Sequence, residues 1–411
     1  MASITLTEKS NLTDIIPDCD VRKVSFISYL AAFIVGTLIP VSGLASPQIA
    51  AHFNVSVSHV VYIDVLTLIG LIIGNIFSGK TIEKIGGKNT LALSGLLLLV
   101  AQYAMGLQNM LVIYAACVLV SGFGIGFMVP SVSYLIVGAF QHQKKSDAKL
   151  SILNFFFSIG SFAGPFIGGW VIKGFGWRSA FIITGTLGLI MFLTSFLTKI
   201  QETIGVQKTV VEKNAVKPEK SKVVTLGVLL VGLGLIAYVY LEYIVSYWFS
   251  PYLQIDLKYN VGIVGTVIGT YWLSVAIGRF VFGEFVLAKV KNYKFVITVA
   301  IVTLIGFVLF LTFNNIVAVF LCTALLGFGC ASIFPTMLGF GMQLNKVNPL
   351  TTAFLIGCGS LGGAISLFVS GTVGEHLTKK TAIYMGPVCC ILIIVFVLLA
   401  HMQSKKKALN K

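Results

Sequence analysis

Charged residues are scarce in this chain. Asp, Glu, Lys and Arg make up 10% of its 411 residues, whereas 57% are hydrophobic and the mean hydropathy is +0.96. Soluble domains carry roughly a quarter charged residues. A chain with so little charge cannot cover a water-facing surface, so a soluble globular protein is excluded. The composition predicts an integral membrane protein.

Clusters of reactive side chains are missing as well. The five histidines are scattered, and the seven cysteines form neither a CxxC pair nor a group with histidine. We therefore expect no metal, no disulfide framework and no cofactor. A membrane enzyme would need a nucleophile, a base or metal ligands inside its apolar segments, so we expect no enzyme. The net charge of +15 does not indicate nucleic-acid binding, because the basic residues lie in short loops between apolar runs.

Long apolar runs recur along the whole chain. A helix needs about 20 residues to cross the hydrocarbon core of a bilayer. We therefore predict an all-α membrane protein with twelve transmembrane helices. The predicted spans are Val24–Leu44, Val60–Ser78, Thr90–Leu107, Leu111–Gly138, Leu150–Ile172, Ala180–Leu197, Val223–Phe249, Val261–Val286, Phe295–Phe313, Ile316–Met342, Thr352–Val373 and Ala382–Ala400.

The loops between these spans differ in their content of lysine and arginine. If the N-terminus is inside, the cytoplasmic segments hold 23 of these residues and the outer loops hold 5. This asymmetry predicts that both termini are cytoplasmic, and a bacterial inner membrane is the expected location. The predicted organisation is a cytoplasmic segment (1–23), a six-helix half (24–198), a cytoplasmic linker (199–222), a second six-helix half (223–402) and a basic tail (403–411).

The two predicted halves repeat each other. "GFGIGFMVPS" (Gly122–Ser131) matches "GFGCASIFPT" (Gly327–Thr336) at an offset of 205 residues. "IGNIFSG" (Ile73–Gly79) matches "IGRFVFG" (Ile277–Gly283) at an offset of 204. Two parallel repeats related by an axis along the membrane normal are the architecture of many secondary transporters. The repeat therefore favours a transporter, acting as a monomer, over a channel or receptor.

A short charged loop follows the second predicted span. In "GKTIEKIGGK" the pattern consists of Gly79, Glu83, Lys84, Gly86 and Lys88. It resembles the signature loop of the major facilitator superfamily, and this resemblance extends over the whole chain. The resemblance implies two six-helix halves that alternate between inward-open and outward-open states, with the loop's carboxylate latching the halves together. An ordinary basic loop is the alternative interpretation.

The fifth predicted span contains a run of small residues, "GSFAGPFIGG". Its Gly160, Gly164, Pro165, Gly168 and Gly169 resemble the antiporter signature of the same superfamily. The resemblance favours export. Small-residue packing between helices is the alternative.

Other segments resemble one branch of the superfamily. "YVYLEYIVSYWFSPYL" (Tyr238–Leu253) and "IFPTMLGFG" (Ile333–Gly341) are similar to the fucose:proton symporters. The segment Gly341–His376 is similar to TsgA-type transporters. These resemblances imply a proton-coupled transporter and favour uptake, but they do not name a substrate.

Glu242 is a carboxylate in the middle of the seventh span. A charged group at that depth costs several kcal/mol in lipid, so we expect it to face a water-filled cavity. Removal from water disfavours the charged form of a carboxyl group, which makes Glu242 a candidate proton carrier. Tyr238 and Trp248 on the same span are candidate substrate contacts. A structural hydrogen bond from Glu242 to a neighbouring helix is the alternative.

Four further residues are candidates for transport. Asp64 lies about one turn inside the second span, so it is either a proton-coupling site or an interfacial acid in reach of water. Arg279 is expected to pair with an acid or with an anionic substrate, unless it is a structural arginine that reaches toward the interface. Asn154 and Thr336, which follows Pro335, are candidate substrate contacts, although Asn154 is equally suited to a hydrogen bond at a helix start.

We conclude from the sequence that the chain is a secondary active transporter of a small solute, working by alternating access. Proton symport is favoured, and a proton-antiport exporter is the alternative. A membrane sensor or receptor without transport is the alternative from another class. The expected partners are the solute, protons and the lipid bilayer.

The predicted orientation can be tested with a single cysteine in the linker. Lys213→Cys should resist an impermeant thiol reagent added outside intact cells, because the basic linker is expected in the cytoplasm. The same variant should react once the cells are opened. Strong labelling of intact cells would reverse the predicted orientation.

Overall fold

A computed structural model describes residues 20–140, 146–200, 224–287, 289–344 and 349–409. These residues form α-helices joined by short connections, and no strand occurs among them. Most of the predicted N-terminal segment and linker lies outside the described residues. Among those described, 12 helical segments are long and apolar enough to cross a membrane, which confirms the predicted all-α fold.

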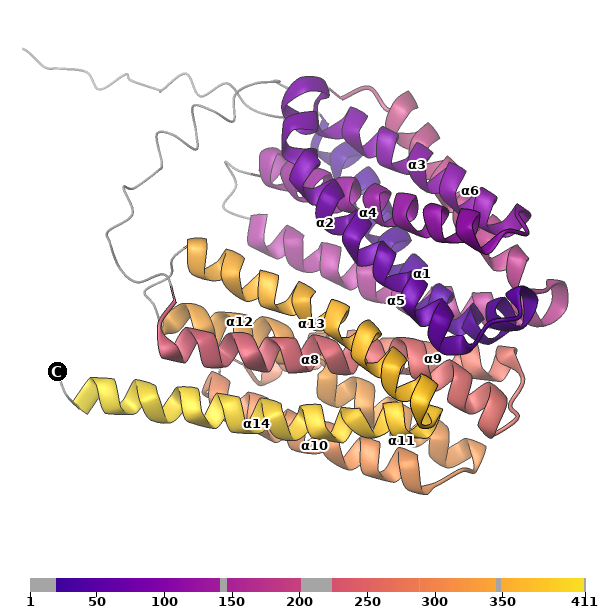
Figure 1. The fold of residues 1–411 in the computed structure, drawn as a ribbon. Helices are drawn as coiled ribbons and strands as arrows, with labels where there is room; N and C mark the ends of the chain where they lie inside the picture. The colour runs from indigo at the N-terminus through magenta and orange to yellow at the C-terminus, as the bar shows by residue number, and fades with distance from the viewer. Residues whose placement is uncertain (1–19, 141–145, 201–223, 288, 345–348, 410–411) are drawn as a thin grey trace, which may run out of the picture.

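The helices form two sets that lie side by side (Figure 1). The first set consists of α1 (Val21–Phe53), α2 (Val57–Ile85), α3 (Gly87–Leu107), α4 (Leu111–Phe140), α5 (Ser146–Phe175) and α6 (Trp177–Leu197). The second set consists of α8 (Leu226–Pro251) with the π-helical turn η3 (Tyr252–Asp256), α9 (Val261–Phe285), α10 (Asn292–Thr312), α11 (Ile316–Cys330), α12 (Ile333–Gln343), α13 (Pro349–His376) and α14 (Lys379–Leu409). In the second set, α8 with η3 forms one span, as does α11 with α12.

The two sides of the bundle are defined by its connections. The start of α1 lies near the end of α6, because Lys23 Nζ donates to the carbonyl of Lys199 at 3.1 Å. The start of α8 lies beside the end of α14, where Gly227 approaches Gln403. We call this the linker side, and it is at the left in Figure 1. The opposite side, where α1 turns into α2 and α13 into α14, is called the far side.

The internal repeat reappears in the packing of the two halves. A side chain at Gly122 on α4 would overlap the carbonyl oxygen of Thr67 on α2. A side chain at Gly327 on α11 would overlap the carbonyl oxygen of Tyr271 on α9 in the same way. Both contacts need glycine because the two helix backbones touch. The sequence match therefore marks the same helix crossing in each half.

The halves differ at the proline of the repeated motif. Pro130 lies inside an unbroken α4, whereas Pro335 follows the break between α11 and α12 at Ala331 and Ser332. Proline has no N–H, so it cannot bond to the carbonyl four residues earlier. Pro335 thus leaves the carbonyl of Ala331 without its usual partner. The predicted tenth span is two helices, and the backbone acceptors at the break between them are available to side chains of other helices.

Helix contact through glycine can be tested with a matched pair of substitutions. Gly122→Ala should destabilise the protein by about 1–3 kcal/mol, because the methyl group forces α2 and α4 apart. Gly174→Ala at the end of α5 is the control, since nothing lies within 4 Å of the place that its methyl group would take. Thermal unfolding of the purified variants measures the difference. Equal melting temperatures would contradict the close packing.

Candidate functional site

A cavity of about 1000 Å³ lies between the two halves. Its walls come from α5, α8, α9 and the region of the α11–α12 break. Ile152 near the start of α5 and Leu287 after the end of α9 belong to its lining, so the cavity extends to the linker side. Its size matches that of pockets that enclose small organic molecules. Three predicted residues line it together: Asn154, Glu242 and Arg279.

Glu242 lies on α8 and faces this cavity, as expected. Its Oε1 lies 2.6 Å from the hydroxyl oxygen of Tyr238, and that hydroxyl also lies 2.9 Å from the carbonyl oxygen of Cys330. Cys330 is the last residue of α11, where a helix leaves its carbonyls without internal partners. Tyr238 itself is fully buried and does not line the cavity. Its role in the geometry is to orient the carboxyl group of Glu242.

Arg279 on α9 connects the two halves across the cavity wall. Its Nε donates to the carbonyl of Ala331 at 3.0 Å, the acceptor that Pro335 leaves free. Its Nη1 donates to Ser158 Oγ on α5 at 2.8 Å. Neither acceptor is charged. The predicted pairing of Arg279 with an acid is not found among the described residues, in which no carboxylate lies within ion-pair distance of this side chain.

Asn154 is exposed on the first half of α5 and lines the cavity opposite α8 and α9. It lies one turn before Ser158, whose hydroxyl donates to the Asn154 backbone carbonyl at 2.9 Å. The side-chain amide is therefore presented to the cavity, and the alternative of a hydrogen bond at a helix start is not seen among the described contacts.

Two other predicted contacts do not lie in the cavity. Trp248 is fully buried, its Nε1 donates to Ser370 Oγ on α13 at 2.7 Å, and its ring packs against Gly374. Thr336 is 5% exposed, and its hydroxyl has no hydrogen-bond partner among the described residues. Neither side chain lines the cavity in this conformation, and their contact with the substrate stays a prediction.

Other residues, which were not predicted from the sequence, line the cavity beside Glu242. Ser332, Pro335 and Leu338 line the cavity at a spacing of three residues, and Val239 lies one turn before Glu242 on α8. Thr336 follows Pro335 by one position and so points about 100° away around the helix. The spacing from Pro335 could have identified this face, had the position of the helix break been known.

Asp64 on α2 is buried rather than interfacial. Its side chain is 1% exposed, and Ser42 Oγ on α1 lies 2.9 and 3.0 Å from its two carboxyl oxygens. It borders a separate space of about 30 Å³ together with Gln102 and Tyr247. That volume is close to the volume of one water molecule, so it cannot hold a solute. Of the two alternatives for Asp64, the interfacial acid in reach of water is not found in this conformation, because Ser42 on α1 and Tyr247 on α8 lie beside it, and a role in proton coupling stays a prediction.

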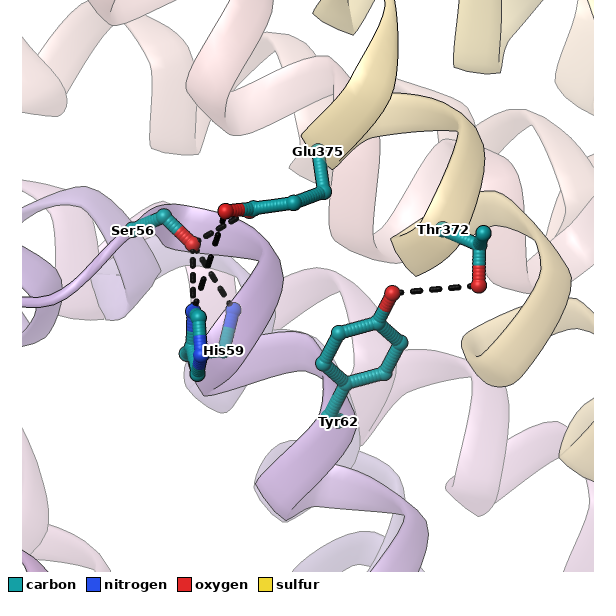
Figure 2. Close-up of polar contacts among 5 residues, drawn as sticks. All are labelled: Ser56, His59, Tyr62, Thr372 and Glu375. Atoms are coloured by element: carbon teal, nitrogen blue, oxygen red, sulfur yellow. Dashed lines mark hydrogen bonds and ion pairs between the residues drawn. The ribbon is translucent and has the colours of Figure 1, made fainter.

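The far side of the cavity is closed by contacts between the halves. Ser56 Oγ, at the start of α2, donates to Glu375 Oε2 on α13 at 2.5 Å, and His59 lies beside this pair (Figure 2). One turn further, the Tyr62 hydroxyl donates to Thr372 Oγ1 at 3.0 Å (Figure 2). The close-up shows α2 and α13 joined at two successive turns.

A second closure lies between α1 and the end of α8. Gln48 Nε2 donates to Gln254 Oε1 at 2.6 Å, and Ser250 Oγ donates to the carbonyl of Leu44 at 2.8 Å. Neither closure could be predicted from the sequence, because each joins residues that are about 200 or more positions apart in the chain. The molecule is therefore closed on the far side and open on the linker side.

The signature loop lies on the open side. α2 ends there with Gly86 at φ 85°, a left-handed conformation that glycine adopts without strain. Glu83 and Lys84 are exposed, and no hydrogen bond or ion pair within the described residues includes the Glu83 carboxylate. The expected latch between the halves is thus not formed in this conformation.

The glycine run of α5 packs against helices of both halves. Gly160 and Gly164 contact the backbone of α1, where a side chain would meet Phe33 and Thr37. Gly169 contacts Gly265 on α9 of the other half. These glycines pack closely on their neighbours, and the contact of Gly169 with Gly265 lies at the boundary across which the halves would have to move.

The comparisons with known proteins agree with this geometry. The family model of the Major Facilitator Superfamily matches residues 24–347. The chain belongs to the Major Facilitator Superfamily. This confirms the resemblance of the signature loop and shows a transporter of a small solute rather than an enzyme.

Among curated proteins, the chain is similar to TsgA of Shigella flexneri, with 23% identity over 368 residues that cover 88% of this chain and 90% of the relative. A TsgA homologue of Yersinia pestis (strain Pestoides F) is 22% identical over 366 residues, covering 88% and 91%. Among solved structures, the nucleoside transporter NupG has a TM-score of 0.71 at 12% identity and covers 92% of this chain and 99% of its own. At that identity, the likeness shows the fold alone.

The far-side closure predicts a conformational lock. With Ser56→Cys and Glu375→Cys combined in a background without reactive native thiols, a short thiol cross-linker should stop transport nearly completely, because α2 and α13 can no longer separate. Reduction should restore transport if the linker is cleavable. Each single-cysteine variant is the control. Undiminished transport after complete cross-linking would show that α2 and α13 need not separate.

Proposed function

We propose that this protein is a proton-coupled secondary transporter that carries a small solute by alternating access, with symport as its mode. The observation that carries the proposal is the Glu242 carboxyl group, which lines the large cavity between the halves. A carboxyl group in such a place can meet both the solute and water from the linker side. Perturbed acids in a cavity of this kind are typical carriers of a coupled proton.

The surroundings of Glu242 suit both of its protonation states. When Glu242 is ionised, the Tyr238 hydroxyl donates its single proton to the carboxylate across the 2.6 Å contact. When Glu242 is protonated, the carboxyl group donates to the Tyr238 oxygen, and Tyr238 turns its proton to the Cys330 carbonyl at 2.9 Å. The Cys330 carbonyl gives up the Tyr238 proton in the ionised state and regains it in the protonated state, so the proton can be gained and lost by turning one hydroxyl group and without rearranging the helices.

The linker side is proposed to be the cytoplasmic side of a bacterial inner membrane, with both termini there. The excess of lysine and arginine in these loops and the bacterial origin of the similar proteins support this orientation. The conformation is then inward-open. Since the whole cavity is built from one chain, a monomer is the proposed functional unit.

The signature loop is proposed to hold the opposite, outward-open state. Glu83 has no partner among the described residues while the linker side is open, as expected of a latch that forms only when this side closes. Glu83→Ala should therefore shift the population toward the inward-open state and increase the rate of the Ser56–Glu375 cross-link. An unchanged rate would argue against the latch.

Asp64 is proposed as a second protonation site that contributes less to proton coupling than Glu242 does. It is sealed from the large cavity and lies beside Ser42, so it can exchange protons only when the contacts around α1 change. Asn154 and Arg279 remain the proposed substrate contacts. Tyr238, Trp248 and Thr336 are not in contact with the cavity here.

A proton-antiport exporter is the second candidate. The packing of Gly164 on α1 and of Gly169 on α9 favours it, because this glycine run lies at the boundary of the halves and resembles the antiporter signature. The two modes differ in the direction of solute movement under one pH gradient. In symport the solute accumulates on the alkaline side, and in antiport it accumulates on the acidic side.

Glu242→Gln is the direct test of coupling. Glutamine keeps the shape of the neutral carboxyl group but cannot release a proton. In proteoliposomes, a gradient of about one pH unit should drive about tenfold accumulation by the parent protein for one proton per solute. The variant should show no accumulation, yet it should still exchange labelled for unlabelled solute across the membrane.

The matched control is Asp64→Asn, which removes the other buried acid without touching the large cavity. It should reduce accumulation less than Glu242→Gln does. If Glu242→Gln accumulates solute as well as the parent protein, Glu242 is a structural residue, and the proton carrier must be sought at Asp64.

A further inference from the structure

Arg279 carries a positive charge that no carboxylate of the described cavity wall contacts directly. Its two hydrogen bonds, to the Ala331 carbonyl and to Ser158 Oγ, both go to uncharged acceptors. A guanidinium group has five N–H donors, so further donors remain. No carboxylate among the described residues lies within ion-pair distance. Arg279 is half-buried in the cavity wall, so its remaining donors face the cavity and are available to an anionic ligand.

The other charged groups of the cavity do not remove this need. Glu242 is held by Tyr238, and under the proposed coupling it is protonated when solute is carried, so it is then neutral. Glu284 is exposed near the end of α9, on the linker side of the cavity, where water solvates it. Arg279 is the one lysine or arginine among the described residues that line the cavity. The loaded site therefore has one positive charge to balance.

The other side chains that line the cavity indicate the chemical character of the uncharged part of the ligand. Phe155, Phe280 and Phe334 contribute aromatic surface, and Val239 and Leu338 contribute aliphatic surface. A solute that fills this space needs an apolar part as well as an anionic end. Asn154, Ser158 and Ser332 add one amide and two hydroxyl groups, of which the Ser158 hydroxyl already bonds to Arg279 and to the Asn154 carbonyl. These groups can orient the ligand but are too few for a molecule with many hydroxyl groups.

We propose that the cavity binds a small organic monocarboxylate with an apolar or aromatic body, whose carboxylate pairs with the Arg279 guanidinium. The planar fork of arginine matches a carboxylate by two parallel hydrogen bonds. A phosphate monoester carries nearly two charges and would need a second cation, which the lining does not offer. This inference rests on the proposed transport function. With one proton on Glu242, one solute anion enters with no net charge.

The test measures binding alone, at one pH and without a gradient, so its outcome is independent of proton coupling. The full-length purified protein is titrated with hydrocinnamate, with its neutral amide hydrocinnamamide, and with phenyl phosphate, followed by calorimetry and thermal shift. Hexanoate and benzoate extend the series of carboxylates. Hydrocinnamate should bind at least tenfold more tightly than hydrocinnamamide and phenyl phosphate.

Three variants locate the interaction. Arg279→Gln should weaken hydrocinnamate binding by about 10- to 100-fold, the loss expected for a hydrogen-bonded charge pair. Arg279→Lys keeps the positive charge but loses the planar pair of N–H donors. Its affinity for hydrocinnamate should therefore lie between that of Arg279→Gln and that of the parent protein. Arg178→Gln is the control on the far side, where the arginine contacts Asn109 and His52 outside the cavity, and it should bind like the parent.

Several results would overturn the proposal. They are equal binding of acid and amide, tighter binding of phenyl phosphate, no binding of any carboxylate in the series, and full hydrocinnamate binding by both Arg279 variants. If Arg279→Gln does not fold, the comparison of acid with amide on the parent protein still decides. Arginine-dependent binding together with accumulation by Glu242→Gln would uphold the ligand class and refute only the proton carrier.

Discussion

The cavity depends on the break between α11 and α12. Pro335 has no N–H, which leaves the carbonyl of Ala331 free, and the end of α11 at Cys330 leaves the carbonyl of Cys330 free. The carbonyl of Ala331 accepts from Arg279, and the carbonyl of Cys330 accepts from Tyr238, which in turn holds Glu242. The break thus positions both Arg279 and Glu242, the charged residues of the proposed transport site. Non-helical backbone at membrane depth is tolerated because it lines a cavity.

The same break explains why the two halves are not equivalent. They share the glycine contacts by which α2 packs on α4 and α9 on α11. The first half, however, keeps α4 unbroken through Pro130 and has Asn75 where the second half has Arg279. The second half therefore supplies Glu242 and Arg279, the charged pair of the proposed transport site. The first half supplies α5 as the opposite wall, and Ser158 on α5 bonds to Arg279 across the boundary.

Closure on the far side follows a different physical rule. The contacts there are hydrogen bonds between side chains of opposite halves, such as Ser56 with Glu375 and Tyr62 with Thr372. Such bonds contribute only about 0.5–1.5 kcal/mol each, or somewhat more when one partner is charged. A closure made of a few of them can open when solute binding supplies a comparable free energy. The close packing of glycines within each half costs far more to disturb, so the halves are expected to move as rigid units.

Much of the fold was predictable from the sequence because hydropathy and loop charge act locally. The twelve spans, the repeat and the family loop needed no knowledge of contacts. The cavity position of Glu242 was expected from the cost of burying a charged group in lipid, whereas Asn154 and Arg279 were candidates with structural alternatives. The surroundings of Trp248 and Asp64 were not predictable because they come from other helices, Ser370 on α13 and Ser42 on α1. Such partners determine how a helix is rotated about its own axis. The hydropathy of the sequence does not predict this rotation.

The central claim is that the carboxyl group of Glu242 gains and loses a proton as solute moves through the cavity. Infrared difference spectroscopy of the reconstituted protein, with and without solute, observes this step directly. The account predicts a change in the band of a protonated carboxyl group that disappears in Glu242→Gln and persists in Asp64→Asn. An unaltered difference band in Glu242→Gln would contradict the account.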